Sequence, residues 1–372
     1  MTARQAPRGD YTDPVFDRSA RMHAVLAAVL NAAALTAAPA SAADQEAPSV
    51  PPACASPGVP IEEAGFVALG GIEQWVTITG RRCGNPIVLF LHGGPGNPLS
   101  PYAAALFSGW EDDFTLVQWD QRGAGRTFGR SPPGDTTLSI QRMVDDGVGL
   151  VEYLTRRLGQ PKVAVVAGSW GSILAVHMVR ARPDLFHAYV GFSQIVGSAQ
   201  NQSATYARLL TLARDAGDAE SVKTLETIGP PPWANPRHPG MVRRITRRYE
   251  AKVTDAPPSH WWVRAPDADT EAMRAADEQG EEYSYLQFVG MNGDGMFAGV
   301  DLPSLGTRFA VPIYIVQGAE DLVTVPDVTR AYVDRIVAPD KAFVPVPRAG
   351  HDPNARMLAA VRALLDEHVR DR

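Results

Sequence analysis

The sequence predicts an α/β fold in which a mainly parallel sheet of eight strands is covered by helices on both faces and carries an inserted helical cap. The first observation is a series of short apolar runs that alternate, in most intervals, with helical patterns. The second is the loss of the strand pattern between Phe192 and Pro312, where the chain is polar and helical. The third is the composition: 45% of the 372 residues are hydrophobic and 20% are charged, as in globular proteins with a large core.

The eight apolar runs are the predicted strands. The first two are expected to form a hairpin, and the other six to form the mainly parallel part of the sheet. In chain order the runs are Val67–Leu69, Trp75–Ile78, Ile87–Leu91, Thr115–Trp119, Val163–Ala167, Ala188–Phe192, Pro312–Val316 and Ala342–Val346. The clearest helix spans residues 138–158, where apolar residues recur at helical spacing from Val144 to Leu158 and Gly159 follows as a C-terminal cap.

Five parts are expected along the chain. They are a signal peptide (1–42), a Pro-rich N-terminal segment (43–65), the first part of the core (66–192), the helical cap (193–310) and the second part of the core (311–372). The apolar run from Ala24 to Ala38, followed by Ala40-Ser41-Ala42, is the layout of a secretory signal with an A-x-A cleavage site. It predicts export, to the periplasm or outside the cell, with cleavage near Ala42. An amphipathic N-terminal helix is the alternative interpretation, and Met22 is an alternative start.

Charge and cysteine content limit the partners. The formal net charge is -6 and no basic face is evident, which argues against nucleic acid and anionic lipid and favours a small or peptide-sized substrate. No other apolar segment approaches the roughly 20 residues of a membrane span, so no stable insertion is expected after cleavage. Cys54 and Cys83 would lie in an oxidising compartment, where either a disulfide or two free thiols is possible.

A candidate nucleophile follows the fifth predicted strand. That strand runs into Gly168-Ser169-Trp170-Gly171, and a helical pattern comes next. Strand, sharp turn and helix are the context of a nucleophile elbow, which lifts one serine hydroxyl to the edge of the sheet. The G-x-S-x-G pattern is imperfect because Ala167 occupies its first position. Ser169 is therefore the predicted nucleophile, and an ordinary turn is the alternative.

A serine hydroxyl needs a general base, which in turn needs an acid to orient it. His351 lies in the loop just after the last predicted strand, from which a side chain can return over the sheet edge. Asp321 follows the seventh predicted strand, between the serine and the histidine, which is the chain order that this fold class has. Adjacent Glu320 is the competing acid, and exposed loop positions are the alternative for all three residues.

The developing oxyanion also needs hydrogen-bond donors. The third predicted strand ends in the run from His92 to Gly96, whose glycines allow main-chain N–H groups to point at a substrate oxygen. Gly94 N–H and Trp170 N–H are the predicted pair. No Gly-Lys-Ser/Thr follows for a phosphate loop, and no cluster has zinc spacing, so neither a cofactor nor a metal is predicted.

Three motifs resemble those of the proline iminopeptidase family of α/β-hydrolases, also called peptidase family S33. They are the runs from His92 to Gly96, from Trp119 to Arg126 and from Gly168 to Gly171, and the similarity extends from about Gly70 to the C-terminus. The resemblance implies an α/β-hydrolase fold with a helical cap, and release of N-terminal residues, often proline, from peptides. It assigns the catalytic triad to Ser169, Asp321 and His351 and the oxyanion hole to Gly94 and Trp170.

The second motif departs from the family pattern. Ala124 and Thr127 replace the usual Cys and Ser of the D-Q-R-G-C-G-R-S run. This segment is expected to act as a scaffold beside the site, with Asp120 and Arg122 forming a local ion pair.

The cap offers candidates for binding the substrate. Family aminopeptidases hold the substrate's amino group with cap glutamates, and Glu278, Glu281 and Glu282 are candidates by their place in the sequence. A solvated acidic helix end is the alternative. Trp233 lies among prolines and is predicted to line an apolar pocket for a proline ring or an acyl chain, or else to belong to the core of the cap.

The combined hypothesis is an exported serine hydrolase that needs no cofactor and acts through an acyl-enzyme on short peptides, cutting after the N-terminal residue. An esterase or amidase of the same fold, acting on an ester substrate without aminopeptidase preference, is the main alternative. A non-catalytic binding module on this scaffold is the other. Haloalkane dehalogenases and epoxide hydrolases are disfavoured because they carry Asp where Ser169 stands.

Overall fold

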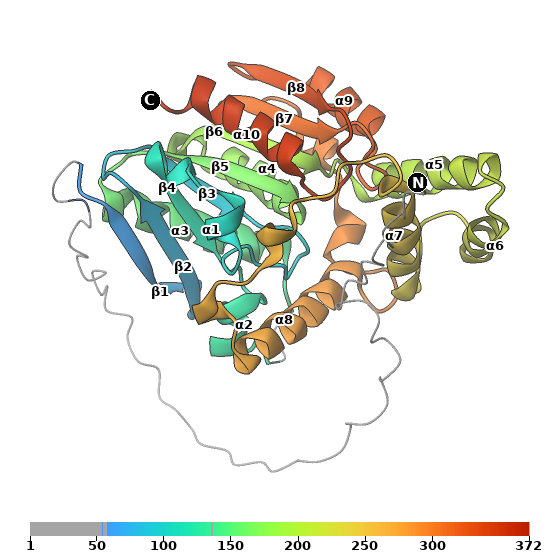
Figure 1. Cartoon of the computed structure of the whole chain (residues 1–372), viewed down its shortest axis with the longest axis horizontal. Helices are drawn as coiled ribbons and strands as arrows, with labels where there is room; N and C mark the ends of the chain where they lie inside the picture. The colour runs from blue at the N-terminus through green and yellow to red at the C-terminus, as the bar shows by residue number, and fades with distance from the viewer. Residues whose placement is uncertain (1–53, 55–57, 135–136, 372) are drawn as a thin grey trace, which may run out of the picture. The chain divides into compact units, whose positions relative to one another are not determined.

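An eight-stranded sheet forms the centre of the molecule in the computed structural model, which describes residues 54, 58–134 and 137–371 (Figure 1). Its order is β1-β2-β4-β3-β5-β6-β7-β8; β1 and β2 pair antiparallel, β2 pairs antiparallel with β4, and the strands from β4 to β8 pair in parallel. The strands are β1 (Ile61–Leu69), β2 (Ile72–Gly80), β3 (Ile87–Leu91), β4 (Thr115–Trp119), β5 (Val163–Ser169), β6 (Phe186–Gln194), β7 (Ile313–Gly318) and β8 (Lys341–Val346). The predicted mainly parallel sheet is confirmed.

Ten α-helices accompany the sheet in the described part of the chain. They are α1 (Ala103–Leu106), α2 (Gly125–Arg130), α3 (Ile140–Leu158), α4 (Trp170–Ala181), α5 (Ser198–Asp215), α6 (Ala219–Ile228), α7 (Arg237–Glu250), α8 (Glu271–Val289), α9 (Pro326–Arg335) and α10 (Ala355–His368). Helix α3 starts two residues later than predicted, where the Ser139 side chain accepts a hydrogen bond from Arg142 N–H, and it ends at left-handed Gly159.

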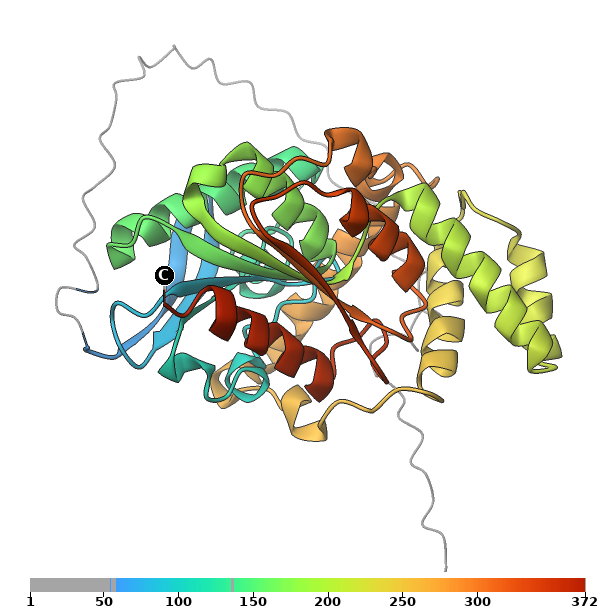
Figure 2. The ribbon, with the colours of Figure 1, turned by 90° about the horizontal axis from the view of Figure 1, so that it is seen from above.

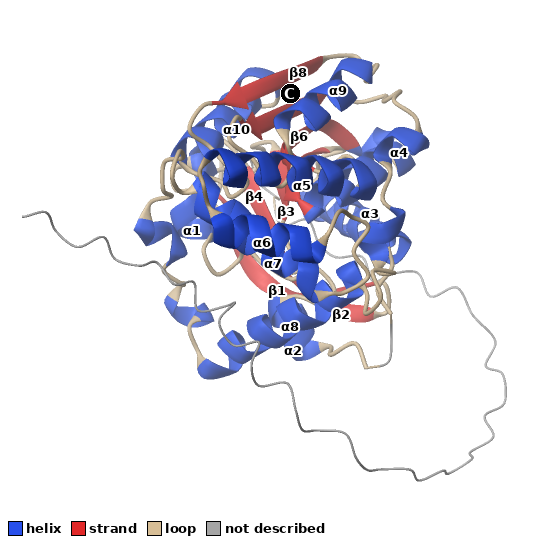
Figure 3. Ribbon diagram, turned by 90° about the vertical axis from the view of Figure 1, so that its right-hand side faces the viewer, coloured by secondary structure: helices blue, strands red, loops and turns tan. Residues whose placement is uncertain are grey.

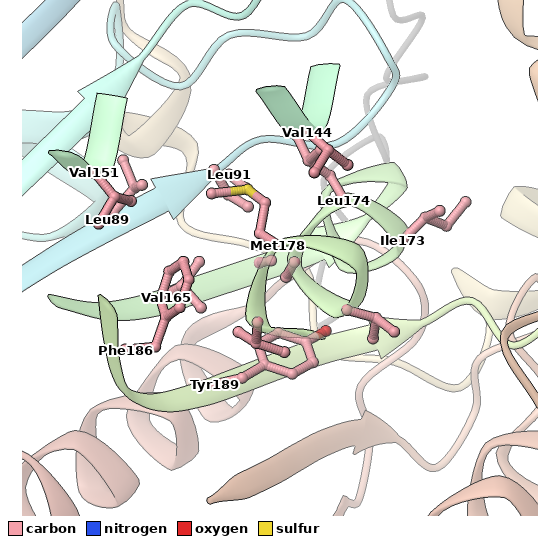
Figure 4. Packing of buried hydrophobic residues seen from close by; sticks show 14 of the residues in the cluster. Leu89, Leu91, Val144, Val151, Val165, Ile173, Leu174, Met178, Phe186 and Tyr189 are labelled. Atoms are coloured by element: carbon pink, nitrogen blue, oxygen red, sulfur yellow. The ribbon is translucent and has the colours of Figure 1, made fainter. Parts of the chain in front are cut away.

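Helices cover both faces of the sheet. Helices α3, α4 and α9 contribute to the apolar core on one face, and α1 and α10 to the core on the other (Figure 2). On the first face, side chains of β3, β5 and β6 such as Leu89, Val165 and Tyr189 meet Val151 of α3 and Met178 of α4 (Figure 4). Burial of these strands on both faces explains why they read as continuous apolar runs.

Helices α5–α8 form the cap, inserted between β6 and β7. Helices α5, α6 and α7 share their own apolar cluster, which includes Leu209, Leu225 and Ile245 (Figure 3). Helix α8 lies apart from this cluster and runs beside α2 (Figure 1). One side chain of the core, Leu322, belongs to the cap cluster, which ties the cap to the loop after β7.

The N-terminal part of the described chain differs from one prediction and agrees with another. Strand β1 begins at Ile61 rather than at Val67 and pairs along its length with β2, so the boundary drawn at residue 65 was wrong. Residues 62–65, Glu-Glu-Ala-Gly, carry no large apolar side chain, so the first half of the strand lacked the pattern that predicts one. Cys54 and Cys83 form a disulfide with Cα atoms 5.3 Å apart, which confirms that hypothesis. The predicted signal peptide lies outside the described residues.

Candidate active site

The turn at Ser169 has the geometry of a nucleophile elbow. Ser169 joins β5 to α4 with φ 51° and ψ -122°, a conformation that non-glycine residues rarely adopt. The glycines on either side permit close packing: a Cβ on Gly171 would lie 2.2 Å from the Leu91 carbonyl oxygen, and one on Gly168 would lie 2.2 Å from the Phe192 ring. These contacts explain why both positions must lack a side chain.

Ser169, His351 and Asp321 are brought together at the ends of β5, β8 and β7. His351 Nε2 lies 3.0 Å from Ser169 Oγ, and His351 Nδ1 lies 3.1 Å from Asp321 Oδ2. The imidazole and the carboxylate are buried, at 7% and 1% exposure. Because the carboxylate accepts a hydrogen bond from Nδ1–H, Nε2 is left free to accept the hydroxyl proton of Ser169.

The Asp321 carboxylate is held by several donors. Its Oδ1 accepts hydrogen bonds from the N–H groups of Val323 and Thr324, at 2.8 and 2.7 Å, and its Oδ2 accepts from Gln317 Nε2 at 2.9 Å. Burial acts to raise the pKa of Asp321, but the charge of His351 and the hydrogen bonds from His351 and Thr324 outweigh it, so the pKa is lowered. The carboxylate that contacts the imidazole is therefore that of Asp321 and not that of neighbouring Glu320.

Ser193 is hydrogen-bonded to the main chain of the histidine. It stands near the end of β6 with φ 47°, is fully buried, and donates a 2.7 Å hydrogen bond from Oγ to the His351 carbonyl oxygen. A strained, buried serine beside a triad member is a positioning feature. Sequence reasoning missed it, because Ser193 directly follows a predicted strand and no motif marks it.

The loop that follows β3 lies against the elbow. A Cβ on Gly93 would be 3.4 Å from the Ser169 Cβ, and Gly94 follows with φ 105°. Trp170 is the first residue of α4, so its N–H belongs to the helix N-terminus, where main-chain donors lack partners within the helix. The structure thus places the two predicted oxyanion donors, Gly94 and Trp170, in segments that flank Ser169.

His92 and Gln121 fix this loop. His92 Nδ1 donates to the Gly93 carbonyl oxygen at 2.9 Å, and His92 Nε2 accepts from Gln121 N–H at 3.2 Å. This pattern requires a neutral imidazole, and burial lowers the pKa of His92 to about 4 against the opposing effect of the Gly93 hydrogen bond. The Gln121 side chain donates to the His92 carbonyl oxygen and accepts from Trp170 Nε1.

The predicted ion pair between Asp120 and Arg122 was wrong. Arg122 Nε lies 2.7 Å from Asp146 Oδ2, in α3, and Arg122 also donates to the Gly70 carbonyl oxygen. Asp120 instead accepts hydrogen bonds from Ser100 Oγ and from Arg126 N–H. Burial raises the pKa of Asp120 to about 7, although these two hydrogen bonds act in the other direction. The two side chains therefore anchor different segments.

The predicted cap residues lie in different places. Glu278 and Glu282 are exposed on α8, whereas Glu281 is half-buried. A Cβ on Gly96 would be 2.7 Å from the Glu281 Cα, so this part of α8 lies against the loop that carries Gly94. Trp233 is buried in the cap and lines a cavity of about 200 Å³ together with residues such as Pro231, Pro232 and Phe297.

Comparison with known proteins agrees with this geometry. Residues 86–355 match the family model described as the alpha/beta hydrolase fold. The chain belongs to the alpha/beta hydrolase fold family. That assignment fits the sheet order, the elbow at Ser169 and the inserted cap.

This hydrolase has relatives with aminopeptidase names. It is 26% identical over 313 residues to a probable aminopeptidase, YbaC, of Bacillus subtilis, covering 82% of this chain and 95% of that protein. It is 27% identical over 305 residues to a probable proline iminopeptidase of Streptomyces coelicolor, covering 78% of this chain and 91% of that one. These relatives confirm the resemblance that the three motifs indicate.

A solved structure supports the fold of the hydrolase. The proline iminopeptidase of Mycobacterium smegmatis superposes with a TM-score of 0.56 at 18% identity, covering 83% of this chain and 100% of that one. Among the described residues, no group of three or more His, Cys, Asp or Glu side chains is placed to hold a metal ion. In the same part of the chain, no helix has the length and apolar character needed to cross a membrane.

Proposed function

We propose that the protein is a serine hydrolase that works through an acyl-enzyme, with Ser169 as nucleophile. The observation that carries this proposal is the chain of contacts from Ser169 Oγ to His351 Nε2 at 3.0 Å and from His351 Nδ1 to Asp321 at 3.1 Å. His351 takes the hydroxyl proton as Ser169 attacks the substrate carbonyl, and Asp321 stabilises the imidazolium. Gly94 and Trp170 N–H groups receive the oxyanion.

The second half of the reaction restores the enzyme. His351 gives its proton to the leaving amine, which departs as the ester between substrate and Ser169 forms. Water then loses a proton to His351 and attacks this ester, and the same proton returns to Ser169 Oγ as the acid product leaves. The free enzyme is regenerated with no net change in protonation.

The proposed substrate is a short peptide, cut after its N-terminal residue, with proline as the favoured residue. The names of the Bacillus subtilis and Streptomyces coelicolor relatives support this choice. Glu281, whose Cα lies beside Gly96, is the proposed carboxylate for the substrate amine. The cavity beside Trp233 is the proposed site for an apolar substrate group.

A substrate panel tests the proposal. A fluorophosphonate should label the wild type at Ser169 and fail to label Ser169→Ala. Proline β-naphthylamide should be hydrolysed faster than its N-blocked form and than a p-nitrophenyl ester. Equal rates for blocked and free amines would leave an esterase or amidase, and no labelling of folded wild type would overturn the serine mechanism.

The role of Glu281 has its own test. Glu281→Gln should raise KM for proline β-naphthylamide by about tenfold and leave p-nitrophenyl ester hydrolysis within about twofold of wild type, because only the first substrate carries an amine. Glu282→Gln, an exposed carboxylate of the same helix, is the matched control. Equal effects on both substrates would count against amine binding.

The proposed place of action is outside the cytoplasm. The A-x-A pattern at Ala40-Ser41-Ala42 and the Cys54–Cys83 disulfide support this, since disulfides persist in oxidising compartments. Fractionation of cells that produce the full chain, followed by N-terminal sequencing, tests the proposal. A cytoplasmic protein that retains residue 1 would contradict it.

A further inference from the structure

Glu250, the last residue of cap helix α7, lies between the two loops that carry Asp321 and His351. It is 5% exposed, and its Oε1 accepts a 2.8 Å hydrogen bond from the N–H of Leu322, the residue after Asp321. A Cβ on Gly350, the residue before His351, would lie 2.9 Å from Glu250 Oε2. One carboxyl group of the cap therefore touches the neighbours of both triad members.

A second charged contact accompanies Glu250 on the same helix. Arg243 lies two turns earlier; its Nη1 is 3.6 Å from Glu250 Oε2 and its Nη2 is 2.6 Å from Oδ1 of Asp352, the residue after His351. The Leu322 side chain is in turn buried in the apolar cluster of α5, α6 and α7. The cap thus holds the acid loop by its main chain and by its side chain, and holds the histidine loop on both sides of the imidazole.

We propose that Glu250 is a positioning residue of the triad, through which a correctly seated cap aligns Asp321 with His351. The inference rests on the proposed serine mechanism and adds a residue to it. Glu250 acts on the main chain of the two loops, so it should influence every reaction of Ser169, whichever substrate is used.

The charge of Glu250 adds a second effect. Burial raises the pKa of Glu250 to about 7, and the nearby charge of Asp321 raises it further, while Arg243, His351 and the Leu322 N–H act in the other direction. Protonation leaves a carbonyl oxygen that still accepts from Leu322, so the alignment survives at lower pH. Above about pH 7 the ionised group also favours the imidazolium that forms at His351 during attack.

Two substitutions separate these effects. Glu250→Ala removes the acceptor, whereas Glu250→Gln keeps an acceptor oxygen and removes the charge. Tyr249→Phe is the matched control, because it removes only the hydroxyl that donates to Asp218 within the cap and keeps the ring in the apolar cluster that includes Leu322. The second-order rate constant of fluorophosphonate labelling reports Ser169 reactivity without any peptide substrate.

The expected results are specific. Glu250→Ala should lower the labelling rate, and kcat for a p-nitrophenyl ester, by about tenfold near pH 6 with little change in KM, and by about a further fivefold near pH 8 because it also removes the charge. Glu250→Gln should match wild type within about twofold near pH 6 and fall about fivefold behind it near pH 8, and Tyr249→Phe should stay within about twofold throughout. Should Glu250→Ala fail to fold, Glu250→Asp decides the question, because its shorter side chain moves the acceptor away from the Leu322 N–H and the same loss near pH 6 is expected.

Two outcomes would overturn the inference. One is folded Glu250→Ala that labels as fast as wild type near pH 6; equal labelling of Glu250→Gln and wild type at pH 8 would overturn the charge effect alone. The other is a rise in KM confined to free-amine substrates, which would make Glu250 a substrate-binding group. Absence of labelling in the wild type would be a different result, since it removes the serine mechanism itself.

Discussion

The indole Nε1 of Trp170 donates a 2.9 Å hydrogen bond to the side-chain oxygen of Gln121. The same side chain donates to the His92 carbonyl oxygen, and the Gln121 main chain donates to the His92 ring. One buried residue therefore connects the helix after Ser169 with the loop that carries Gly94. The two predicted oxyanion donors belong to these two segments, so their spacing depends on Gln121.

Loss of the Gln121 side chain should slow the chemical step. Gln121→Leu is expected to lower kcat by about tenfold with little change in KM, because oxyanion donors act mainly in the transition state. Steady-state kinetics on a p-nitrophenyl ester measures this. The matched control is Gln118→Leu, since Gln118 is also buried but its Nε2 has no hydrogen-bond partner among the residues that the structure describes. An equal loss in both variants would contradict the assigned role.

Ser193 should affect rate and stability in different ways. Ser193→Ala removes the hydrogen bond to His351 and keeps the backbone strain at φ 47°, whereas Ser193→Gly removes both. We expect both variants to lose about three- to tenfold in kcat, and the Gly variant to be about 1 kcal/mol more stable than the Ala variant. Kinetics and urea denaturation measure the two effects. Wild-type kcat in Ser193→Ala would exclude a positioning role.

Asp120 should make folding stability depend on pH. Its pKa is raised to about 7 in the folded protein, so the folded state binds this proton more tightly than the unfolded state. The contribution of Asp120 to stability therefore falls as pH rises from about 4 to about 7. Asp120→Asn lacks this titrating group. Between about pH 4 and about pH 7, its free energy of unfolding should therefore fall by about 1–3 kcal/mol less than that of the wild type. Denaturant titrations at several pH values provide the measurement, and parallel curves would contradict the prediction.

Replacing Gly96 should destabilise the protein mainly because a side chain there would clash with α8, and less because of the positive φ. Gly96 and Gly84 have φ of 98° and 100°, but a Cβ on Gly96 would lie 2.7 Å from the Glu281 Cα, whereas a Cβ on Gly84 would have nothing within 4 Å. Gly84→Ala therefore measures the strain alone. We expect Gly96→Ala to be at least about 2 kcal/mol less stable than Gly84→Ala, by thermal or chemical denaturation. Similar losses would show that α8 yields easily at this point.

Local sequence signals were enough to predict the parts of the site that lie at strand ends. Strands β3 and β4 begin and end where predicted, because fully buried strands give unbroken apolar runs. Parallel strands bring their C-terminal ends to one edge, so Ser169, Asp321 and His351 converge although the chain separates them widely. Knowing which strand precedes each residue was therefore enough to predict that the three side chains meet.

Contacts between distant elements could not be predicted in the same way. Arg122 pairs with Asp146 and not with nearby Asp120, because the folded position of α3 decides which carboxylate meets a buried guanidinium. Glu250 ends an arginine-rich helix and resembles a surface carboxylate in the sequence; its burial follows from the packing of the cap on the core. Such choices depend on tertiary geometry, which no short motif encodes.

The bond between Cys54 and Cys83 also has a practical consequence. Main-chain hydrogen bonds from Gly58 N–H to the Cys83 carbonyl oxygen and from Cys83 N–H to the Val59 carbonyl oxygen lie next to it, so it secures the start of edge strand β1. Closing a loop with a sequence separation of 29 is worth about 3.5 kcal/mol in the chain-entropy treatment. Protein produced in a reducing bacterial cytosol would lack this disulfide, and its melting temperature would be lower than that of oxidised preparations.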